Sequence, residues 1–405
     1  MKTPSTSTSS RNMRLLGHHP LNGFGNCGEG LALQKTRDGR RVLWIAHESQ
    51  PKNVTALDVT NPKKPVLIAQ TDLPHEKMRS NSLDLVGDLL VVAYQTSAVG
   101  LKPAGFEIFD VADPAKPKSV VFFDAAGPAS RGVHHLWWVD GEYVHIASGA
   151  ADFTPRNPRD DQFYRIIDVR TITRPREVGR WWLPGTRDSD TAPPLPRHPT
   201  FDSGYRAHNT NVYPQRPDRA YIGYLDGGAC VLDIADKAHP KLVTRWDYHP
   251  PFPGFCHTVL PLFERKLLVV SDEATKPAGA DYPKLVWIVD NREESKPVPI
   301  STCPLPFKQY AKRGGRFGAH NLHENRPGHW YSEKIIVGTF FNGGLRAFDL
   351  SDPFRPEEVA YFVPPAPRKS PTKAIQINDV LIDERRIVYA VDRMIGGVYI
   401  LEMKV

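Results

Sequence analysis

Cysteine is scarce in this chain. Among 405 residues there are four, Cys27, Cys230, Cys256 and Cys303, and no two of them have CxxC spacing. A small disulfide-stabilised scaffold has a much higher cysteine density, and a zinc ribbon needs closely paired cysteines. The sequence therefore argues against both classes and agrees with reduced thiols in a cytoplasmic protein.

Long apolar runs and dense basic runs are also missing. No stretch approaches the roughly 18 apolar residues that a membrane-spanning helix requires. The segment Met1–Arg11 is rich in Ser and Thr, with no apolar stretch behind it, so we expect neither a secretory signal nor an anchor. The net charge of +7 is spread along the chain, whereas nucleic-acid binding needs a concentrated basic stripe. We expect neither a membrane nor a nucleic-acid partner. We expect a small-molecule substrate, and the positive net charge would favour an anionic one. The sequence does not indicate the oligomeric state.

Helical periodicity is almost absent, and the 38 prolines stand at apparent turns. No GxSxG, P-loop or GxGxxG motif occurs in its required context, so the sequence gives no support to a serine hydrolase, a nucleotide hydrolase or a Rossmann enzyme. An all-β fold remains.

One phrase recurs six times: strand-like residues, an Asp, an aliphatic residue, several polar residues and a Pro. In every copy the Asp precedes the Pro by seven positions. An aspartate at that place accepts N–H bonds in a turn, and the proline presets the backbone before an outer strand. The copies read TALDVTNPKKP, EIFDVADPAKP, RIIDVRTITRP, CVLDIADKAHP, WIVDNREESKP and RAFDLSDPFRP.

The spacing of these copies predicts a seven-bladed β-propeller with four-stranded antiparallel blades, because about 50–65 residues fit one blade with long loops. A seventh copy, VYILEMKV, ends the sequence and lacks an outer strand. Met13–His19 resembles the outer strands of other repeats, so we predict that it completes the seventh blade and closes the ring. The expected organisation is a disordered tail over residues 1–12 and one propeller domain over 13–405.

The repeated phrase resembles the LVIVD-repeat β-propeller proteins, most clearly in FEIFDVADPAKP and LRAFDLSDPFRP. The similarity extends over residues 13–405, although the third and fifth copies depart from it in the turn. The resemblance implies a propeller fold and names no single reaction.

A second pattern lies at the start of each expected innermost strand. Innermost strands of a propeller line its central channel, so equivalent positions in successive blades form a ring. Four of the seven residues in this ring are histidines from adjacent blades. The seven residues are Glu29, Asn81, His134, His208, His257, His320 and Asn378.

Four converging imidazoles predict a transition-metal site with open coordination positions. His134, His208, His257 and His320 are the expected ligands, and strand alternation lets only one of His134 and His135 face the axis. Fe(II) is the first choice of metal, with Zn, Mn or Cu as alternatives. The expected geometry is similar to the four-His iron centre of carotenoid cleavage oxygenases, whose sequence phrases are absent here. A water-filled ring without a metal is the competing interpretation.

Loops after the second strand of each blade should open on the same face as these histidines. They present a mixture of aromatic and polar residues that suits a small organic substrate. Glu273 and Glu29 are the candidate catalytic acid–base residues. The candidate substrate-binding residues are His47, Glu48, Gln95, Asp226, Phe341, Asn342 and Arg393.

Three functions remain open at this stage. The first is a metal-dependent oxidoreductase, such as a dioxygenase, acting on a small aromatic or anionic substrate. The second is a metal-dependent lyase or hydrolase that uses the same site. The third is a propeller without catalytic activity that binds a protein or ligand.

Overall fold

The computed structural model describes residues 8–405. By its contacts the chain divides into two compact units. Unit 1 consists of the described part of Met1–Gly28, with Asp58–Leu67 and Leu260–Val405, and unit 2 of Glu29–Leu57 and Ile68–Val259. Helix is nearly absent: η1 (Leu21–Gly23) and α1 (Phe307–Tyr310) are single turns. Within residues 8–405 no helix has the length and apolarity to cross a membrane.

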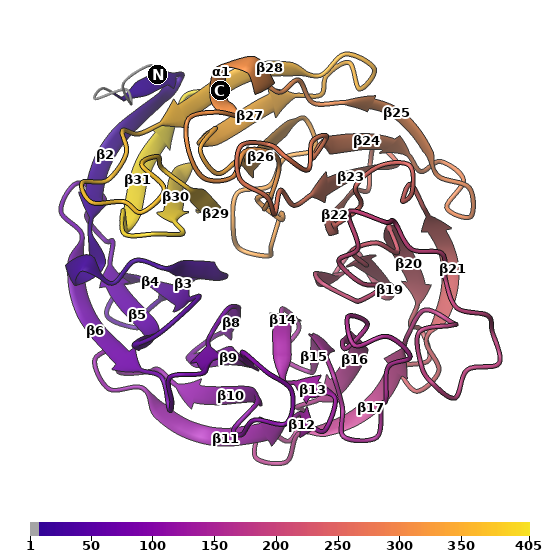
Figure 1. The fold of residues 1–405 in the computed structure, drawn as a ribbon. Helices are drawn as coiled ribbons and strands as arrows, with labels where there is room; N and C mark the ends of the chain where they lie inside the picture. Colours follow the sequence, from indigo (N-terminus) through magenta and orange to yellow (C-terminus); the bar gives the residue numbers. More distant parts are fainter. Residues whose placement is uncertain (1–7) are drawn as a thin grey trace. The chain divides into compact units, whose positions relative to one another are not determined.

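Unit 2 contains four antiparallel sheets, whose strands follow one another in chain order (Figure 1). A short hairpin, β12 (Ala126–Gly127) and β13 (Ser130–Arg131), lies between the second and third sheets. The first sheet is β3 (Cys27–Lys35), β4 (Arg41–His47), β5 (Lys52–Asp58) and β6 (Val66–Asp72), and the second is β7 (Met78–Arg79), β8 (Leu83–Val86), β9 (Leu89–Thr96), β10 (Gly105–Asp110) and β11 (Lys118–Asp124). The third is β14 (Val133–Trp137), β15 (Tyr143–Ser148), β16 (Phe163–Asp168) and β17 (Arg176–Trp181), and the fourth is β18 (Thr210–Tyr213), β19 (Arg216–Gly223), β20 (Ala229–Asp233) and β21 (Lys241–Trp246).

Unit 1 contains most of the other three sheets. The fifth sheet is β22 (Cys256–Leu262), β23 (Leu267–Asp272), β24 (Val286–Asp290) and β25 (Val298–Thr302). The sixth is β26 (Ile335–Thr339), β27 (Leu345–Asp349) and β28 (Glu357–Val363), with β1 (Ser9–Arg11) at its outer edge. The seventh is β29 (Ile377–Ile382), β30 (Ile387–Asp392) and β31 (Val398–Met403), with β2 (Met13–His19). The predicted seven-bladed propeller of four-stranded antiparallel sheets is confirmed.

The repeated Asp–Pro phrase acts in the structure as a turn signal. In all six copies the third strand ends at the Asp, and the outer strand begins at the residue after the Pro. Each Asp also accepts a hydrogen bond from the backbone N–H two residues later, with lengths from 2.7 to 3.1 Å. This local bond fixes the turn and explains why its spacing is constant while other loops vary. The six are Asp58, Asp110, Asp168, Asp233, Asp290 and Asp349.

Burial differs between the strands of one sheet. The second strands β4 and β9 are buried along almost their whole length, whereas the outer strands β6 and β11 are half-exposed. Trp44 of β4 and Val92 of β9 belong to one hydrophobic cluster between the first two sheets. Packing on both faces explains why the second strands read as continuous apolar runs.

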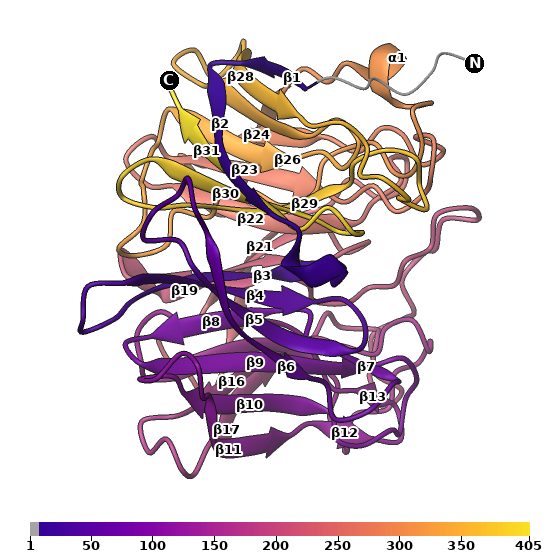
Figure 2. The same cartoon turned by 90° about the vertical axis from the view of Figure 1, so that its left-hand side faces the viewer.

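The N-terminal strand β2 pairs antiparallel with the C-terminal strand β31, from Met13 opposite Met403 to His19 opposite Val398 (Figure 2). Met13 is buried in the same core as Met403. This confirms the prediction that Met13–His19 supplies the outer strand of the seventh blade. A register shift between Leu15 and Gly17 matches the shift between the third and outer strands in other sheets.

Two local features differ from the sequence-based expectation. Of the tail expected over residues 1–12, residues 1–7 lie outside the described part, but Ser9–Arg11 form β1 and pair with β28. In the sixth sheet, the segment after His320 forms an isolated bridge, Leu322 to Gly338, and a few backbone hydrogen bonds to β26, instead of the expected regular inner strand. The sixth sheet thus gains its fourth strand at the outer edge.

Candidate metal centre

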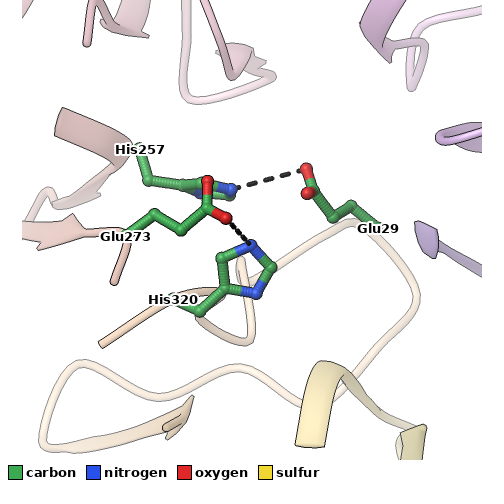
Figure 3. A group of neighbouring side chains, drawn as sticks. All are labelled: Glu29, His257, Glu273 and His320. Carbon is green, nitrogen blue, oxygen red and sulfur yellow. Dashed lines mark ion pairs between the residues drawn. The ribbon is translucent and has the colours of Figure 1, made fainter. Parts of the chain in front are cut away.

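Unit 2 brings together one carboxylate and three imidazoles. The Glu29 Oε2 atom lies 4.0 Å from His134 Nε2, 3.9 Å from His208 Nε2 and 3.4 Å from His257 Nε2. All four side chains are buried. Figure 3 shows the Glu29 carboxylate directed at the His257 ring. A buried Glu/His cluster of this kind could bind a metal ion.

Each member stands at or next to the start of an inner strand, as the repeat predicts. Glu29 is on β3, His257 is on β22, and His208 comes two residues before β18. The chain at His134 bulges: Val133 pairs with Ser148 and His135 with Ala147, so His134 is the extra residue. A β-bulge redirects a side chain relative to the normal alternation of a strand. The bulge turns His134 toward His208, whereas His135 Nδ1 lies 3.5 Å from Thr210 Oγ1.

Gly30 allows the strand that carries Glu29 to approach its neighbour. A Cβ atom at this position would lie 2.5 Å from the backbone nitrogen of Leu83, well inside van der Waals contact. The Glu29 N–H donates to the carbonyl of Asn81 at 2.7 Å. The backbone that carries the carboxylate is therefore fixed against the second sheet.

A hydrogen bond to the other ring nitrogen orients each imidazole. His134 Nδ1 lies 2.9 Å from Gln95 Oε1, and His208 Nδ1 lies 2.9 Å from Asn209 Oδ1. Asn209 Oδ1 is an amide oxygen, which only accepts, so His208 Nδ1 carries the proton. His134 Nδ1 faces both an acceptor, Gln95 Oε1, and a donor, Arg79 Nη2 at 3.2 Å. His257 Nδ1 lies 2.8 Å from the Thr258 hydroxyl. Outer contacts of this kind fix the tautomer and the ring orientation of metal-binding histidines.

The His208 tautomer directs a lone pair into the cluster. With Nδ1 protonated, the neutral His208 ring has an unprotonated Nε2, which lies 2.7 Å from His134 Nε2. The Glu29 carboxylate adds negative charge at the same place. A lone pair and an anion repel each other, and a cation between them removes this repulsion. The donor set therefore fits a metal ion.

The charge state of His134 also suits a ligand. Burial, and next the neighbouring His208 and Arg79, hold the pKa of His134 well below its usual range. The ring is neutral at physiological pH, and neutral imidazole is the form that binds metals.

His320 and Glu273 lie in unit 1, where they form a pair of their own. His320 Nε2 is 3.8 Å from Glu273 Oε1 (Figure 3). Its Nδ1 donates to the carbonyl of Asn378 at 2.7 Å. Arg316 Nη1 also contacts Glu273, at 2.7 Å. The orientation of His320 thus follows the pattern of the other three histidines. Its role as a ligand, and the acid–base role of Glu273, stay predictions from the repeat.

The two asparagines of the predicted ring form backbone contacts. Asn378 Nδ2 donates to the carbonyls of Cys27 and Gly28, both at 3.0 Å, and Asn81 Nδ2 donates to the carbonyl of His134 at 3.4 Å. These amides position the strand starts. Arg393, a candidate substrate residue, donates from Nη1 to Asn378 Oδ1 at 3.2 Å.

The other candidate substrate residues have diverse contacts. In unit 2, Gln95 holds His134, and Glu48 pairs with Arg79 at 3.2 Å. His47 Nε2 is 2.8 Å from the Thr55 hydroxyl, and Asp226 accepts backbone N–H bonds from Ser203 and Gly204.

In unit 1, the Phe341 ring stacks on His320 with centroids 4.8 Å apart, and Asn342 donates to the carbonyl of Gly314. Of the seven candidates, Gln95 and Phe341 therefore contact a predicted ligand directly, and Arg393 contacts the ring asparagine Asn378. Glu48 pairs with Arg79, and the other three, His47, Asp226 and Asn342, hold their own loops and sheets.

Sequence reasoning missed the residues that orient the rings. Asn209 and Thr258 each follow a histidine directly, so the dipeptides His-Asn and His-Thr at a strand start were an available signal. No such signal in the sequence points to Arg79. Its guanidinium donates to Gln95 Oε1 from Nε at 3.0 Å and from Nη2 at 2.6 Å. It comes from a separate short strand, β7.

Replacing Asn209 with Leu is expected to weaken metal affinity about 10- to 100-fold, the usual cost of losing an outer-shell partner. The change removes the acceptor for His208 Nδ1 and keeps the side-chain volume. Titration with Co(II) against a competing chelator measures the affinity. Asn209→Asp keeps the acceptor and should retain most of the affinity, whereas equal affinities for all three proteins would contradict the assignment.

Comparison with known proteins agrees with the fold. The LVIVD repeat model matches residues 218–247, which contain the fourth Asp–Pro phrase. No curated protein matches the chain in sequence.

Solved propellers resemble the chain at low identity. The Cps50 (Swd1) β-propeller domain of Myceliophteria thermophila has a TM-score of 0.54 at 13% identity, over 93% of this chain and 96% of that one. The N-terminal domain of Nup159 has a TM-score of 0.55 at 11% identity, over 99% and 97%. A protein from Lactobacillus plantarum has 0.55 at 10% identity, over 83% and 88%. At such identities the likeness concerns the fold alone. The matched repeat and the seven sheets together show a seven-bladed β-propeller that carries an LVIVD repeat at residues 218–247.

Proposed function

We propose that this protein is a metal-dependent enzyme, an oxidoreductase of the oxygenase type that acts on a small organic substrate. One observation carries the proposal: the Glu29 Oε2 atom lies within 4.0 Å of the Nε2 atoms of three buried histidines, His134, His208 and His257. Such a site buried in a fold core is costly without a cation.

Fe(II) is the proposed metal, with Zn, Mn and Cu as alternatives. The donor atoms are imidazole nitrogens and a carboxylate oxygen, and histidine–carboxylate sites with open positions are typical of non-haem Fe(II) oxygenases. Bound there, the metal would supply a redox-active centre for dioxygen chemistry or a Lewis acid for lyase and hydrolase chemistry.

The residues of this chain would then have two roles, binding the metal and orienting the residues that bind it. His134, His208, His257 and Glu29 would hold the cation, while Gln95, Asn209 and Thr258 orient the three rings. We assign Glu29 to the ligand set in preference to acid–base catalysis, because its Oε2 faces all three Nε2 atoms.

The test is anaerobic loading of untagged protein with Fe(II), followed by nitric oxide. We expect about one equivalent of bound iron and an iron–nitrosyl EPR signal, since an open position accepts this analogue of dioxygen. Bound metal with no nitrosyl signal would contradict the oxygenase assignment and favour the lyase or hydrolase alternative. Less than about 0.2 equivalents of any transition metal would contradict the enzyme proposal and favour a binding scaffold.

We also propose a cytoplasmic location. All four cysteines are buried and none is part of a disulfide, and burial raises the pKa of the Cys230 thiol to about 12. Thiols that stay reduced are usual in a reducing compartment.

A further inference from the structure

A pocket of about 560 Å³ opens in unit 2 and shares a wall with the metal centre. Arg79 and Gln95 line this pocket, and both also reach His134: Gln95 Oε1 is 2.9 Å from its Nδ1, and Arg79 Nη2 is 3.2 Å from the same atom. A ligand in the pocket would therefore lie next to a proposed metal ligand.

Strand pairing sets the order of these side chains. β7 pairs with β9 so that Arg79 is opposite Gln95, and on the other side Gln95 forms a bridge with Gly132. Arg131 precedes Gly132 and also lines the pocket. Gly132 has a φ of +89°, and a Cβ there would lie 2.4 Å from the carbonyl of Tyr94, so only glycine permits this approach.

Arg131 presents hydrogen-bond donors to the pocket. Within residues 8–405 its side chain makes one hydrogen bond, from Nε to Asp161 Oδ2 at 2.6 Å. The four N–H groups on Nη1 and Nη2 remain for a ligand, and the side chain is one-quarter exposed. A guanidinium edge of this kind binds carboxylate or phosphate oxygens in a fork.

The charge around the pocket is positive. Three cations line it, Lys77, Arg79 and Arg131, against two carboxylates, Glu48 and Glu76. Behind the wall, Asp161 contacts two guanidinium groups, those of Arg131 and Arg206, and cannot neutralise both.

Most of the residues that line the pocket have polar or charged side chains. Met78 is its one large apolar side chain, and Ser49, Gln50, Thr96 and Ser97 complete the wall.

We infer that this pocket binds a small polar organic anion, a carboxylate or a phosphate monoester, through Arg131. The identification of that anion as the substrate rests on the proposed function, whereas the anion site itself does not. Lys77 adds a second, exposed positive charge, so binding weakens as salt rises.

The test is calorimetric titration of chelator-treated protein at low ionic strength with three probes: L-malate, glycerol 3-phosphate and uncharged glycerol. We expect one of the two anions to bind and glycerol not to bind. Arg131→Gln should weaken binding at least about tenfold, because a charge-assisted contact is lost. Arg131→Lys should restore part of it, and Arg159→Gln, an exposed residue paired with Asp202, is the matched control without effect.

If neither anion binds, or if Arg131→Gln binds as tightly as the unaltered protein, the inference is overturned. Because the probes are added without metal, this result is independent of the metal centre. A Co(II) titration of the same preparations reports the metal site separately, so anion binding without metal uptake would uphold the pocket and overturn the enzyme proposal.

Discussion

Replacing His208 with alanine is expected to remove metal binding while leaving the fold intact. His208 is central in the cluster: its ring centroid lies 4.3 Å from that of His134 and 4.1 Å from that of His257. Losing a ligand should weaken affinity by more than about 100-fold, the upper range for losing only an outer-shell partner. Co(II) absorption titration measures the affinity, and circular dichroism checks the fold.

The matched control is His239→Ala. His239 is exposed, and its Nδ1 lies 2.8 Å from the exposed carboxylate of Asp236, so the change should alter neither metal uptake nor the melting temperature. A His208→Ala protein that keeps the parent affinity would show that the cluster is not the metal site.

Removing residues 1–20 is expected to lower the melting temperature by on the order of 10 °C and to promote aggregation. The deletion removes β1 and β2, including buried Met13, and leaves the edge of β31 unpaired. In a chain of this size about 1 kcal/mol shifts the midpoint by only 1–2 °C, so the loss of a whole strand should be visible. An unpaired edge is also a template for association. Thermal unfolding followed by light scattering measures both effects.

Two further variants provide a control and a second test of the pairing of β2. Deletion of residues 1–7 removes neither strand and serves as the control. Gly17→Val places a side chain where a Cβ would lie 2.2 Å from the carbonyl of Pro62, so it should loosen β2 without shortening the chain. Equal melting temperatures for the 1–20 deletion and the control would contradict closure by β2.

The fold was predictable because its signals are local and repeated. A single turn, with an Asp that accepts an N–H two residues on and a Pro before the outer strand, recurs six times, and six identical spacings define the blades. The N-terminal strand could be recognised because the seventh repeat lacked its outer strand. The sixth inner segment was predicted as a strand, but apart from the bridge at Leu322 it has no regular pairing.

The candidate site was predictable only in part. The histidines share one repeat position, which sequence spacing can reveal. The bulge that selects His134 over His135 depends on pairing with β15, and the role of Arg79 depends on its place opposite Gln95. Such cross-strand contacts have no signature in a single sequence, because they depend on register between distant segments.

Anomalous X-ray scattering from crystals of untagged, iron-loaded protein is the most direct test of the metal centre. We predict one peak about 2.1 Å from the Nε2 atoms of His134, His208 and His257, with a Glu29 oxygen also in the coordination shell. Two results would contradict the proposed metal centre. One is electron density that shows only water, and the other is a set of imidazoles hydrogen-bonded to one another with no anomalous peak among them.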